Sequence, residues 1–450
     1  MRKSLPPGPS YPSVIQGVGF WARPLAYLEQ CRARYGSRFT IRLPTSPPFV
    51  MLADPADIKQ VFTAPADVLR PGAGARVLEP IVGSKSVLLL DGAEHMEQRK
   101  LMLPAFHGER MAALTEVMAE VAERDVAGWP RRREIELHPR MQALTLAIIL
   151  RAVFGLEPGA RSDALRERMQ AMLEFGDRAI SLSPPPKDSV AARVFARVPA
   201  VAHFLRTQAE VDELLFELIA ERRRDESPGD DVLAMLLEAR HEDGSPMSEQ
   251  ELRDELLTLL VAGHETTAST LAWAFERIKD RADVLARLTD EIDADEGDAY
   301  LTATIQERLR LKPVLPNAQP RQVAQPIEVG GWTYPVGCAL VASAYLVHHD
   351  PALYPDPYAF RPERFLDEQP GTYTWIPFGG GRRRCLGASF AMLEMKLVLR
   401  AVLGACRLDS GGRGFEVARR RNITIRPSEG AVAVLTDRAP VAPPLARSSA

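Results

Sequence analysis

Cysteine is scarce in this chain of 450 residues, which contains only four, far apart and without a C-x-x-C pair. That spacing excludes a secreted disulfide framework, gives no indication of a zinc site and favours a reducing compartment. A strong charge of one sign is also missing, since 56 Lys and Arg face 59 Asp and Glu and the formal net charge is -3. A protein built mainly to hold nucleic acid is therefore not indicated.

Long apolar runs are absent as well. Runs such as 144–150 and 256–262 stop well short of the roughly 20 residues that a membrane span needs. The charged start turns directly to prolines, without the apolar stretch of a signal peptide. With 46% hydrophobic and 26% charged residues and no repeat or linker, we expect one globular, monomeric, cytoplasmic domain over 1–450, with a frayed tail at 438–450.

The order of sequence patterns predicts a mainly α fold with a smaller β part. Strand-like patterns cover 38–70, 314–345 and the C-terminal strands, and helical patterns cover 93–310 and 386–403. Ser248 and Glu251 form a capping-box pattern, and apolar positions then recur at helical spacing to about Ile278. At 1.5 Å per residue these ~30 residues span about 45 Å, enough to cross a large domain.

A glycine-rich turn at 378–387, FGGGRRRCLG, carries the most informative cysteine. Backbone N–H groups of such a turn can point at the sulfur of Cys385, and the N-terminus of the following helix favours negative charge, so both stabilise a thiolate. Arg383 adds a cation that can meet a carboxylate of a bound cofactor. An isolated intracellular cysteine is more often a small buried hydrophobe, and we assign that role to the other three cysteines.

This segment resembles the haem-binding signature of cytochromes P450, Phe-x-x-Gly-x-Arg-x-Cys-x-Gly. All five fixed positions match, at Phe378, Gly381, Arg383, Cys385 and Gly387. At residue frequencies near 5%, such a match arises by chance in roughly one of 10⁴ chains. The resemblance implies the P450 fold, with haem b between the long central helix and the helix after the cysteine loop. It places Phe378, Gly379 and Gly387 against the haem and makes Cys385 the axial thiolate ligand of the iron, which favours O–O cleavage.

The long helix carries a second pattern of the same family, Ala262-Gly263-His264-Glu265-Thr266-Thr267. Ala262 and Thr266 share a face one turn apart, and Gly263 lets a ligand approach the backbone, so the resemblance places Ala262 and Gly263 beside the haem. It also implies that Glu265 and Thr266 are the acid–alcohol pair that relays protons to dioxygen. The alternative for Thr266 is a structural hydrogen bond to the carbonyl of residue 262. His264 falls between the pocket positions and is expected to turn away from the iron.

Two further sets of charged residues match the family. Glu307 and Arg310 stand at i, i+3 and can pair on a helix, as many surface pairs do for only ~0.3 kcal/mol. With Arg364 of the later Pro-Glu-Arg-Phe they resemble the Glu–Arg–Arg triad that holds the haem loop. The family also places cations beside the two haem propionates, and the resemblance assigns that role to His95, Arg99, Arg321 and Arg383. The ordinary alternative for each is a solvated surface position.

Two departures from the family stand out. The segment 278–304 is short and acidic where many relatives carry an additional helix, so its local fold is in doubt. The proline-rich start lacks the N-terminal anchor of microsomal members, which indicates a soluble bacterial-type enzyme.

The substrate-contacting segments of the family fall at 77–90, 172–200, 260–269, 314–319 and 422–425. Here they are mainly apolar, and we expect pocket walls at Leu89, Leu90, Val261, Ala262 and Leu315. A hydrophobic guest follows, with fatty acid, terpenoid, steroid and polyketide all open. The predicted activity is O2-dependent hydroxylation or epoxidation. A haem-thiolate enzyme that uses peroxide or isomerises its substrate is the alternative, and a non-catalytic haem sensor is the third possibility.

One haem domain uses the whole chain, so electrons from NAD(P)H have to arrive through a ferredoxin or flavodoxin with its reductase. Arg382, Arg384 and Lys396 cluster around the cysteine loop and can attract such an acidic partner. A solvated basic face is an equally good interpretation of these three residues.

Overall fold

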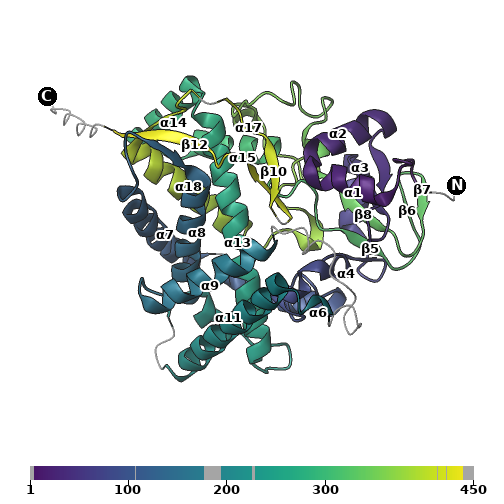
Figure 1. The fold of residues 1–450 in the computed structure, drawn as a ribbon, viewed down its shortest axis with the longest axis horizontal. Helices are drawn as coiled ribbons and strands as arrows, with labels where there is room; N and C mark the ends of the chain where they lie inside the picture. Colours follow the sequence, from purple (N-terminus) through teal and green to yellow (C-terminus); the bar gives the residue numbers. More distant parts are fainter. Residues whose placement is uncertain are drawn as a thin grey trace.

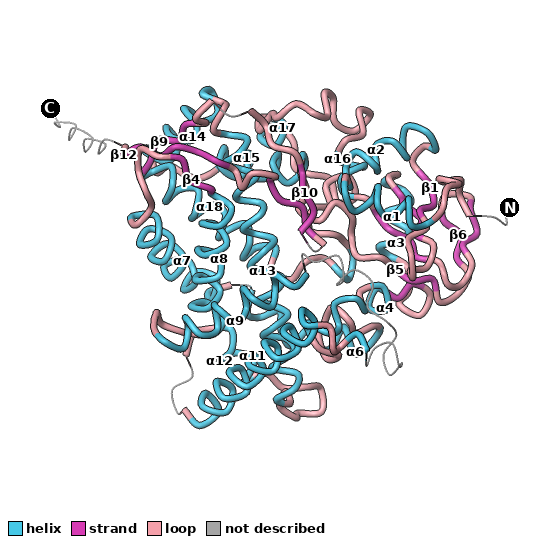
Figure 2. Tube along the Cα trace, viewed as in Figure 1, coloured by secondary structure: helices cyan, strands magenta, loops and turns pink. Residues whose placement is uncertain are grey.

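The computed structural model describes residues 5–106, 108–176, 194–225, 229–412, 414–421 and 423–438. Long helices fill one side of the molecule, and most strands lie on the other side (Figures 1 and 2). The principal helices are α6 (Gly92–Met102), α7 (Glu109–Ala127), α8 (Leu137–Phe154), α9 (Ala160–Gly176), α11 (Pro199–Arg224), α12 (Val232–Glu238), α13 (Glu249–Ile278), α14 (Ala282–Ala294), α15 (Ala299–Leu311) and α18 (Ala388–Ala405). Shorter helices are α1 (Ser13–Ala22), α2 (Pro24–Tyr35), α3 (Pro55–Thr63), α4 (Pro71–Gly74), α5 (Glu79–Val82), α16 (Ala344–His348) and α17 (Arg364–Asp367).

Helix α13 crosses the centre of the molecule (Figure 1) and begins where the capping box predicted. The Ser248 hydroxyl accepts from the backbone N–H of Glu251 at 3.2 Å, and the Glu251 carboxylate accepts from the N–H of Ser248 at 2.8 Å. These reciprocal bonds satisfy N–H groups that the first helical turn leaves without an intrahelical acceptor.

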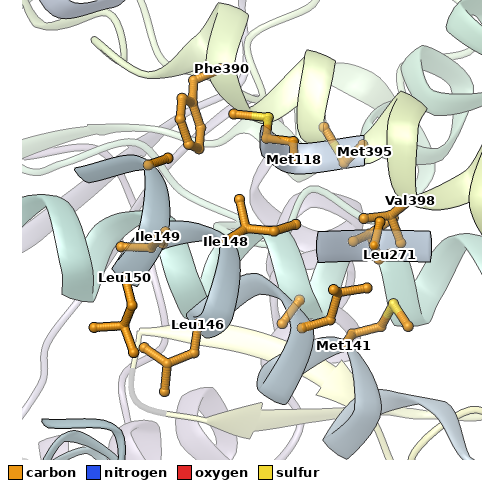
Figure 3. Close-up of a cluster of buried hydrophobic side chains, with 14 of the residues drawn as sticks. Met118, Met141, Leu146, Ile148, Ile149, Leu150, Leu271, Phe390, Met395 and Val398 are labelled. Carbon is orange, nitrogen blue, oxygen red and sulfur yellow. The ribbon is translucent and has the colours of Figure 1, made fainter. Parts of the chain in front are cut away.

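The main core lies among α7, α8, α13 and α18, where α13 packs against α8 and α18, and α7 packs against the same two helices. Helix α8 is apolar on most of its circumference and is largely buried, as expected for a helix enclosed on several sides. Figure 3 shows part of this core, with Met118 of α7, Ile148 of α8, Leu271 of α13 and Val398 of α18 directed toward one another. This packing fixes α13 relative to the helix that follows the cysteine loop.

The largest sheet has the strand order β1-β2-β8-β5-β3. Its strands are β1 (Arg38–Ile41), β2 (Phe49–Leu52), β3 (Leu69–Arg70), β5 (Arg321–Val323) and β8 (Ala339–Ala342). The predicted hairpin at 38–54 is confirmed, because β1 and β2 pair antiparallel with Arg38 opposite Leu52. Strand β2 then pairs parallel with β8, which joins the N-terminal hairpin to the later β-rich segment.

Smaller sheets complete the β part. Their strands are β4 (Glu134–Glu136), β6 (Ile327–Val329), β7 (Trp332–Tyr334), β9 (Cys406–Asp409), β10 (Ala418–Arg421), β11 (Thr424–Pro427) and β12 (Val432–Asp437). Strands β6 and β7 form one hairpin and β10 and β11 another, and β12 lies between β4 and β9. Strand β4 interrupts the stretch predicted as helical almost throughout, because its backbone pairs with β12.

The doubt about segment 278–304 is corrected by the structure, which forms helix α14 there. Val284 and Leu288 are buried on its inner face. The acidic residues that weakened the helical prediction have partners, since the Glu291 carboxylate accepts from the backbone N–H groups of Tyr300 at 2.6 Å and Leu301 at 2.9 Å. Glu291 thus satisfies N–H groups at the start of α15.

Some sequence-based predictions fall outside the described residues: positions 177–193 of the substrate-contacting segment 172–200, position 422 and the tail at 439–450. Within the described part of the chain, no helix combines the length and the apolar character needed to cross a membrane.

Candidate active site

The loop that carries Cys385 is held by its own backbone. The N–H of Cys385 donates to the carbonyl of Phe378 at 2.9 Å, and the N–H of Arg384 donates to the carbonyl of Gly381 at 3.1 Å. Gly381 has a φ of 62°, and a Cβ there would lie 2.2 Å from the carbonyl oxygen of Phe62 in α3. Only glycine fits that position, so the motif residue lets the loop pack directly on α3.

Cys385 differs from the other three cysteines in its surroundings. It is exposed, whereas Cys31, Cys338 and Cys406 are buried, and Cys406 begins a strand of the small C-terminal sheet. Burial raises the pKa of Cys31 and Cys338 to about 11. Although Cys385 keeps accessible surface, the protein atoms around its sulfur disfavour the charged form and raise the pKa of the thiol. The N–H of Gly387 and the charges of Arg99 and Arg384 act in the opposite direction and favour a thiolate.

Part of the middle of α13 is accessible to solvent. Ala262 is exposed and Gly263 and Thr266 are half-buried, although Leu260 and His264 on the same helix are buried. The Thr266 hydroxyl donates to the carbonyl of Ala262 at 2.6 Å, which is the structural hydrogen bond considered as an alternative. Its oxygen can still accept a hydrogen bond, so this geometry is compatible with both interpretations of Thr266.

Glu265 lies in a buried polar network on another side of α13. Its carboxylate accepts from the Gln142 amide at 2.8 Å and from the Ser269 hydroxyl at 3.1 Å. His138 of α8 and Arg421 of β10 lie 3.5 and 3.3 Å away. Burial alone would raise the pKa of Glu265, but the hydrogen bond with His138 and the charge of Arg421 outweigh it and lower the pKa to about 2.

His264, the next residue of the motif, is buried and directed toward α8. Its Nδ1 lies 3.0 Å from the hydroxyl of Thr145. Burial lowers the pKa of His264 to about 4, so the ring is neutral at neutral pH.

The four residues predicted to bind the haem propionates lie close together in the structure. Asp91, which was not predicted, lies beside them. His95 and Arg321 are buried, and Arg99 and Arg383 are half-buried. Arg383 pairs with Asp91 at 2.8 Å, and among the described ion pairs the other three have no carboxylate partner. Burial and the charges of Arg383 and Arg99 lower the pKa of His95 to about 3, and burial and Arg383 lower that of Arg321 to about 10. This excess of positive charge fits an anionic ligand such as the two propionates of a haem.

A pocket reaches this cluster from the surface and is lined by His95, Arg321 and Arg383. Its other lining residues include Phe62, Met96 and Arg382. The Arg321 guanidinium lies 4.4 Å from the centre of the Phe62 ring, so the same aromatic residue supports the cysteine loop and this cation.

The predicted triad is assembled, with Glu307 and Arg310 buried and Arg364 half-buried. Arg310 donates to the two carboxylate oxygens of Glu307 at 2.7 and 2.9 Å, and Arg364 donates to Glu307 at 3.3 Å. The Glu307 and Arg310 side chains have 0% exposure, so the pair is not a solvated surface pair. Arg310 also donates to the carbonyls of His348 and Pro357 at 2.8 and 2.7 Å, which ties α15 to the chain segment before the cysteine loop.

Segment 85–91 runs between α13 and the cysteine loop. The N–H of Lys85 donates to Asp254 at 2.8 Å and that of Val87 to Glu255 at 2.7 Å, both on α13. Arg383 donates to the carbonyls of Val87, at 3.0 Å, and Leu90. The predicted walls Leu89, Leu90, Val261 and Leu315 are half-buried and Ala262 is exposed, so these apolar residues all keep accessible surface.

The predicted basic face is only partly available. Arg382 and Arg384 are exposed, but Lys396 pairs with Asp298 at 2.6 Å. The neighbouring Arg400 likewise lies 3.2 Å from Asp295. The acidic segment before α15 therefore neutralises part of the positive charge on α18.

Comparisons with known proteins agree with this architecture. The family model described as cytochrome P450 matches residues 6–432. The chain is 39% identical to cytochrome P450 135B1 of Mycobacterium tuberculosis, with 95% of this chain and 90% of that protein covered. It is 36% identical to cytochrome P450 138 of the same species, with 96% and 97% covered.

Two solved structures share the fold. The haem domain of cytochrome P450DA superposes with a TM-score of 0.84 at 22% identity, covering 98% of this chain and 99% of that chain. The retinoic acid-bound cyanobacterial CYP120A1 has a TM-score of 0.82 at 23% identity, covering 97% and 100%.

The fold and these relatives define a haem-thiolate monooxygenase, an enzyme whose haem iron is bound by a cysteine thiolate. The chain belongs to the cytochrome P450 family.

Several polar neighbours of the site were missed from the sequence. His138, Gln142 and Ser269 surround Glu265 but carry no motif, and Arg421 comes from a strand 156 positions later in the chain. Asp91 was detectable in principle, because it directly precedes helix α6 and acidic side chains are common at that position.

Proposed function

We propose that this P450 uses O2 to hydroxylate or epoxidise a hydrophobic small molecule, with electrons from a separate redox partner. The observation that carries this proposal is the accessible surface of Ala262 and Thr266 in the middle of α13, a helix of 30 residues. Apolar walls from segments 88–90 and 314–315 favour a guest with little polar surface. Fatty acids, terpenoids, steroids and polyketides all meet that description, and a Soret-shift screen against them would identify the substrate.

We assign the role of iron ligand to Cys385, because it alone combines exposure, a nearby N–H donor and neighbouring cations. His95, Arg99, Arg321 and Arg383 would hold the propionates. Ala262, Gly263, Phe378, Gly379 and Gly387 would lie against the haem. When bound, the haem supplies O2 activation and the transfer of one oxygen atom to the substrate.

The ligand assignment is tested by the spectrum of the reduced protein with carbon monoxide. We expect an absorption band near 450 nm, which the family name implies, because Cys385 would supply a thiolate to the haem iron. Cys385→Ser should abolish the band, and Cys406→Ser, a matched control, should keep it. A band near 420 nm only in fresh folded protein, or loss of the 450 nm band in the Cys406 variant instead, would overturn the assignment.

Glu265 and Thr266 are proposed to move protons during turnover. The overall reaction converts substrate, O2, two electrons and two protons into oxygenated product and water, so protons must reach the oxygen that leaves as water. The Thr266 hydroxyl can accept a hydrogen bond from a water molecule while it donates to Ala262. Without that proton delivery, the electrons are expected to leave as hydrogen peroxide.

The test compares the product formed per NAD(P)H consumed in wild type and Thr266→Ala, with reduced ferredoxin saturating and a substrate from the screen. We expect haem content, substrate binding and electron consumption to persist while product falls and peroxide rises. Thr270→Ala is the control, since Thr270 also bonds to a helix carbonyl, that of Thr266, at 2.7 Å. If the product formed per NAD(P)H is unchanged, Thr266 does not relay protons. Efficient turnover with peroxide and no partner would favour the peroxide-using alternative.

Arg382 and Arg384 are proposed to receive the acidic redox partner, a ferredoxin or flavodoxin supplied by an NAD(P)H-dependent reductase. Both are exposed next to Cys385, and Lys396 contributes less because Asp298 pairs with it. Arg384→Glu should slow reduction by ferredoxin and weaken the dependence of the rate on salt. Reduction at the wild-type rate would place the partner elsewhere.

A further inference from the structure

The two carboxylate oxygens of Glu265 have different partners, so the carboxylate has a defined orientation. Oε2 receives the Gln142 amide at 2.8 Å and faces Arg421 at 3.3 Å. Oε1 receives the Ser269 hydroxyl at 3.1 Å and lies 3.5 Å from Nε2 of His138. Gln142 and Arg421 therefore fix the carboxylate, and its second oxygen faces a serine and a histidine.

Glu265 also lacks the proton that its predicted role requires. With a pKa of about 2 it is a carboxylate throughout the neutral range, because His138 and Arg421 outweigh the effect of burial. A carboxylate can pass on a proton only after it has received one. The donor has to be protonated for an appreciable fraction of the time near neutral pH, and among side chains that is the ordinary property of histidine.

His138 is placed to be that donor. Its ring is 2% exposed, and its Nε2 lies 3.2 Å from the Ser269 hydroxyl, which in turn lies 3.1 Å from Glu265. Helix α8, which carries His138 near its start, packs along α13, which carries both other residues (Figure 1). Three side chains from two packed helices thus form a continuous chain of hydrogen-bonding atoms.

We propose that His138 supplies protons to Glu265 through the hydroxyl of Ser269. His138 gives its Nε2 proton to the Ser269 oxygen as Ser269 gives its own hydroxyl proton to Oε1 of Glu265. One N–H bond breaks, one O–H bond forms on the carboxyl, and the serine ends with a hydroxyl as before. The imidazole is then neutral, and a proton that ultimately comes from solvent has to return to it before the next turnover. This positioning role rests on the proposed function, because it matters only where turnover consumes protons.

The charged groups of this network come from α13 and β10. The Glu265 carboxylate lies beside the His138 ring with one oxygen and beside the Arg421 guanidinium with the other. His264 on α13 adds little, since burial keeps that ring neutral. Ser269 is uncharged and can donate or accept. The Glu265 carboxylate therefore lies between the His138 imidazole and the Arg421 guanidinium.

The experiment compares His138→Gln with wild type in full-length holoenzyme that carries an identified substrate and saturating reduced ferredoxin. Glutamine can still bond to Ser269 but cannot hold an ionisable proton. The wild-type kcat should fall as pH rises, because a neutral imidazole has no proton to give to Ser269. In His138→Gln we expect kcat about tenfold lower, that pH limb lost, more peroxide per NAD(P)H and a larger solvent deuterium effect. KM and the 450 nm band should not change.

The matched control is His241→Gln, because His241 also sits beside carboxylates, 3.0 Å from Glu97 and 3.6 Å from Glu251, but lies outside the Glu265 network. It should keep the wild-type pH profile. Ser269→Ala, a smaller change, should reproduce the pH profile of His138→Gln. It tests the proton transfer on its own if His138→Gln does not fold. The inference is overturned if either variant binds haem normally and keeps the wild-type kcat and pH limb. A wild type without O2-dependent product would instead overturn the proposed function.

Discussion

Replacing Glu307 by alanine should destabilise this protein more than any exposed charge substitution. The Glu307 carboxylate accepts from Arg310 twice, from Arg364, and from the backbone N–H of Arg361 at 2.9 Å. It is completely buried, as is Arg310. Removing the carboxylate leaves a buried guanidinium without its counter-ion, and solvent cannot replace that partner because neither side chain is accessible.

The expected cost follows from that burial. Removing one partner of a buried ion pair costs about 3–5 kcal/mol. Folded domains are stable by roughly 5–15 kcal/mol, so this loss is a large fraction of the total. Arg310 keeps its hydrogen bonds to the carbonyls of His348 and Pro357, so the expected cost comes from the unpaired charge. Glu307→Gln, which retains an acceptor oxygen, should therefore cost less than Glu307→Ala.

Urea unfolding of the haem-loaded protein and the haem content after expression measure both effects. Asp163→Ala is the matched control, since Asp163 pairs with Arg166 at the same i, i+3 spacing at 2.8 Å but with 62% of its side chain exposed. That variant should lie within about 0.5 kcal/mol of wild type. If Glu307→Ala also unfolds within 1 kcal/mol of wild type and keeps its haem, the reasoning from burial is refuted.

Three further outcomes are expected. Burial raises the pKa of Glu255 to about 8, above its unfolded value of about 4.3, so its contribution to stability is lost as pH rises from the unfolded pKa to the folded pKa. Glu255→Gln should flatten this fall in stability, measured by urea unfolding between about pH 5 and 8.5. If the stability of both proteins falls equally steeply with pH, the prediction is contradicted. Arg321→Met should speed haem transfer to apomyoglobin severalfold, whereas the exposed Arg70→Met should not. Ser248→Ala should cost about 1 kcal/mol in the same unfolding assay, and no change would deny the cap a role.

The parts of the fold that could be predicted depend on neighbours in the sequence. Helix α13 was predicted because Ser248 and Glu251 interact within one turn, and the cysteine loop because Cys385 and its glycines act over a few positions. The contact between Glu265 and Arg421 depends on how a C-terminal hairpin packs against α13, and no local pattern encodes it. Helix α14 was doubted because its segment is short and acidic, and a partner such as the start of α15, which donates to Glu291, is found only in the folded chain.

The attachment of segment 85–91 has a consequence for attempts to alter which molecules this enzyme accepts. Arg383 donates to the carbonyls of Val87 and Leu90 and pairs with Asp91, so one cation of the haem site is anchored to the chain that also forms a wall of the substrate pocket. Replacing the Leu89 side chain leaves those backbone acceptors in place and can reshape the pocket alone. An insertion or deletion in the segment would move the carbonyl acceptors of Arg383 and weaken the binding of the haem. Engineering of substrate range is therefore best confined here to side-chain exchange at constant loop length.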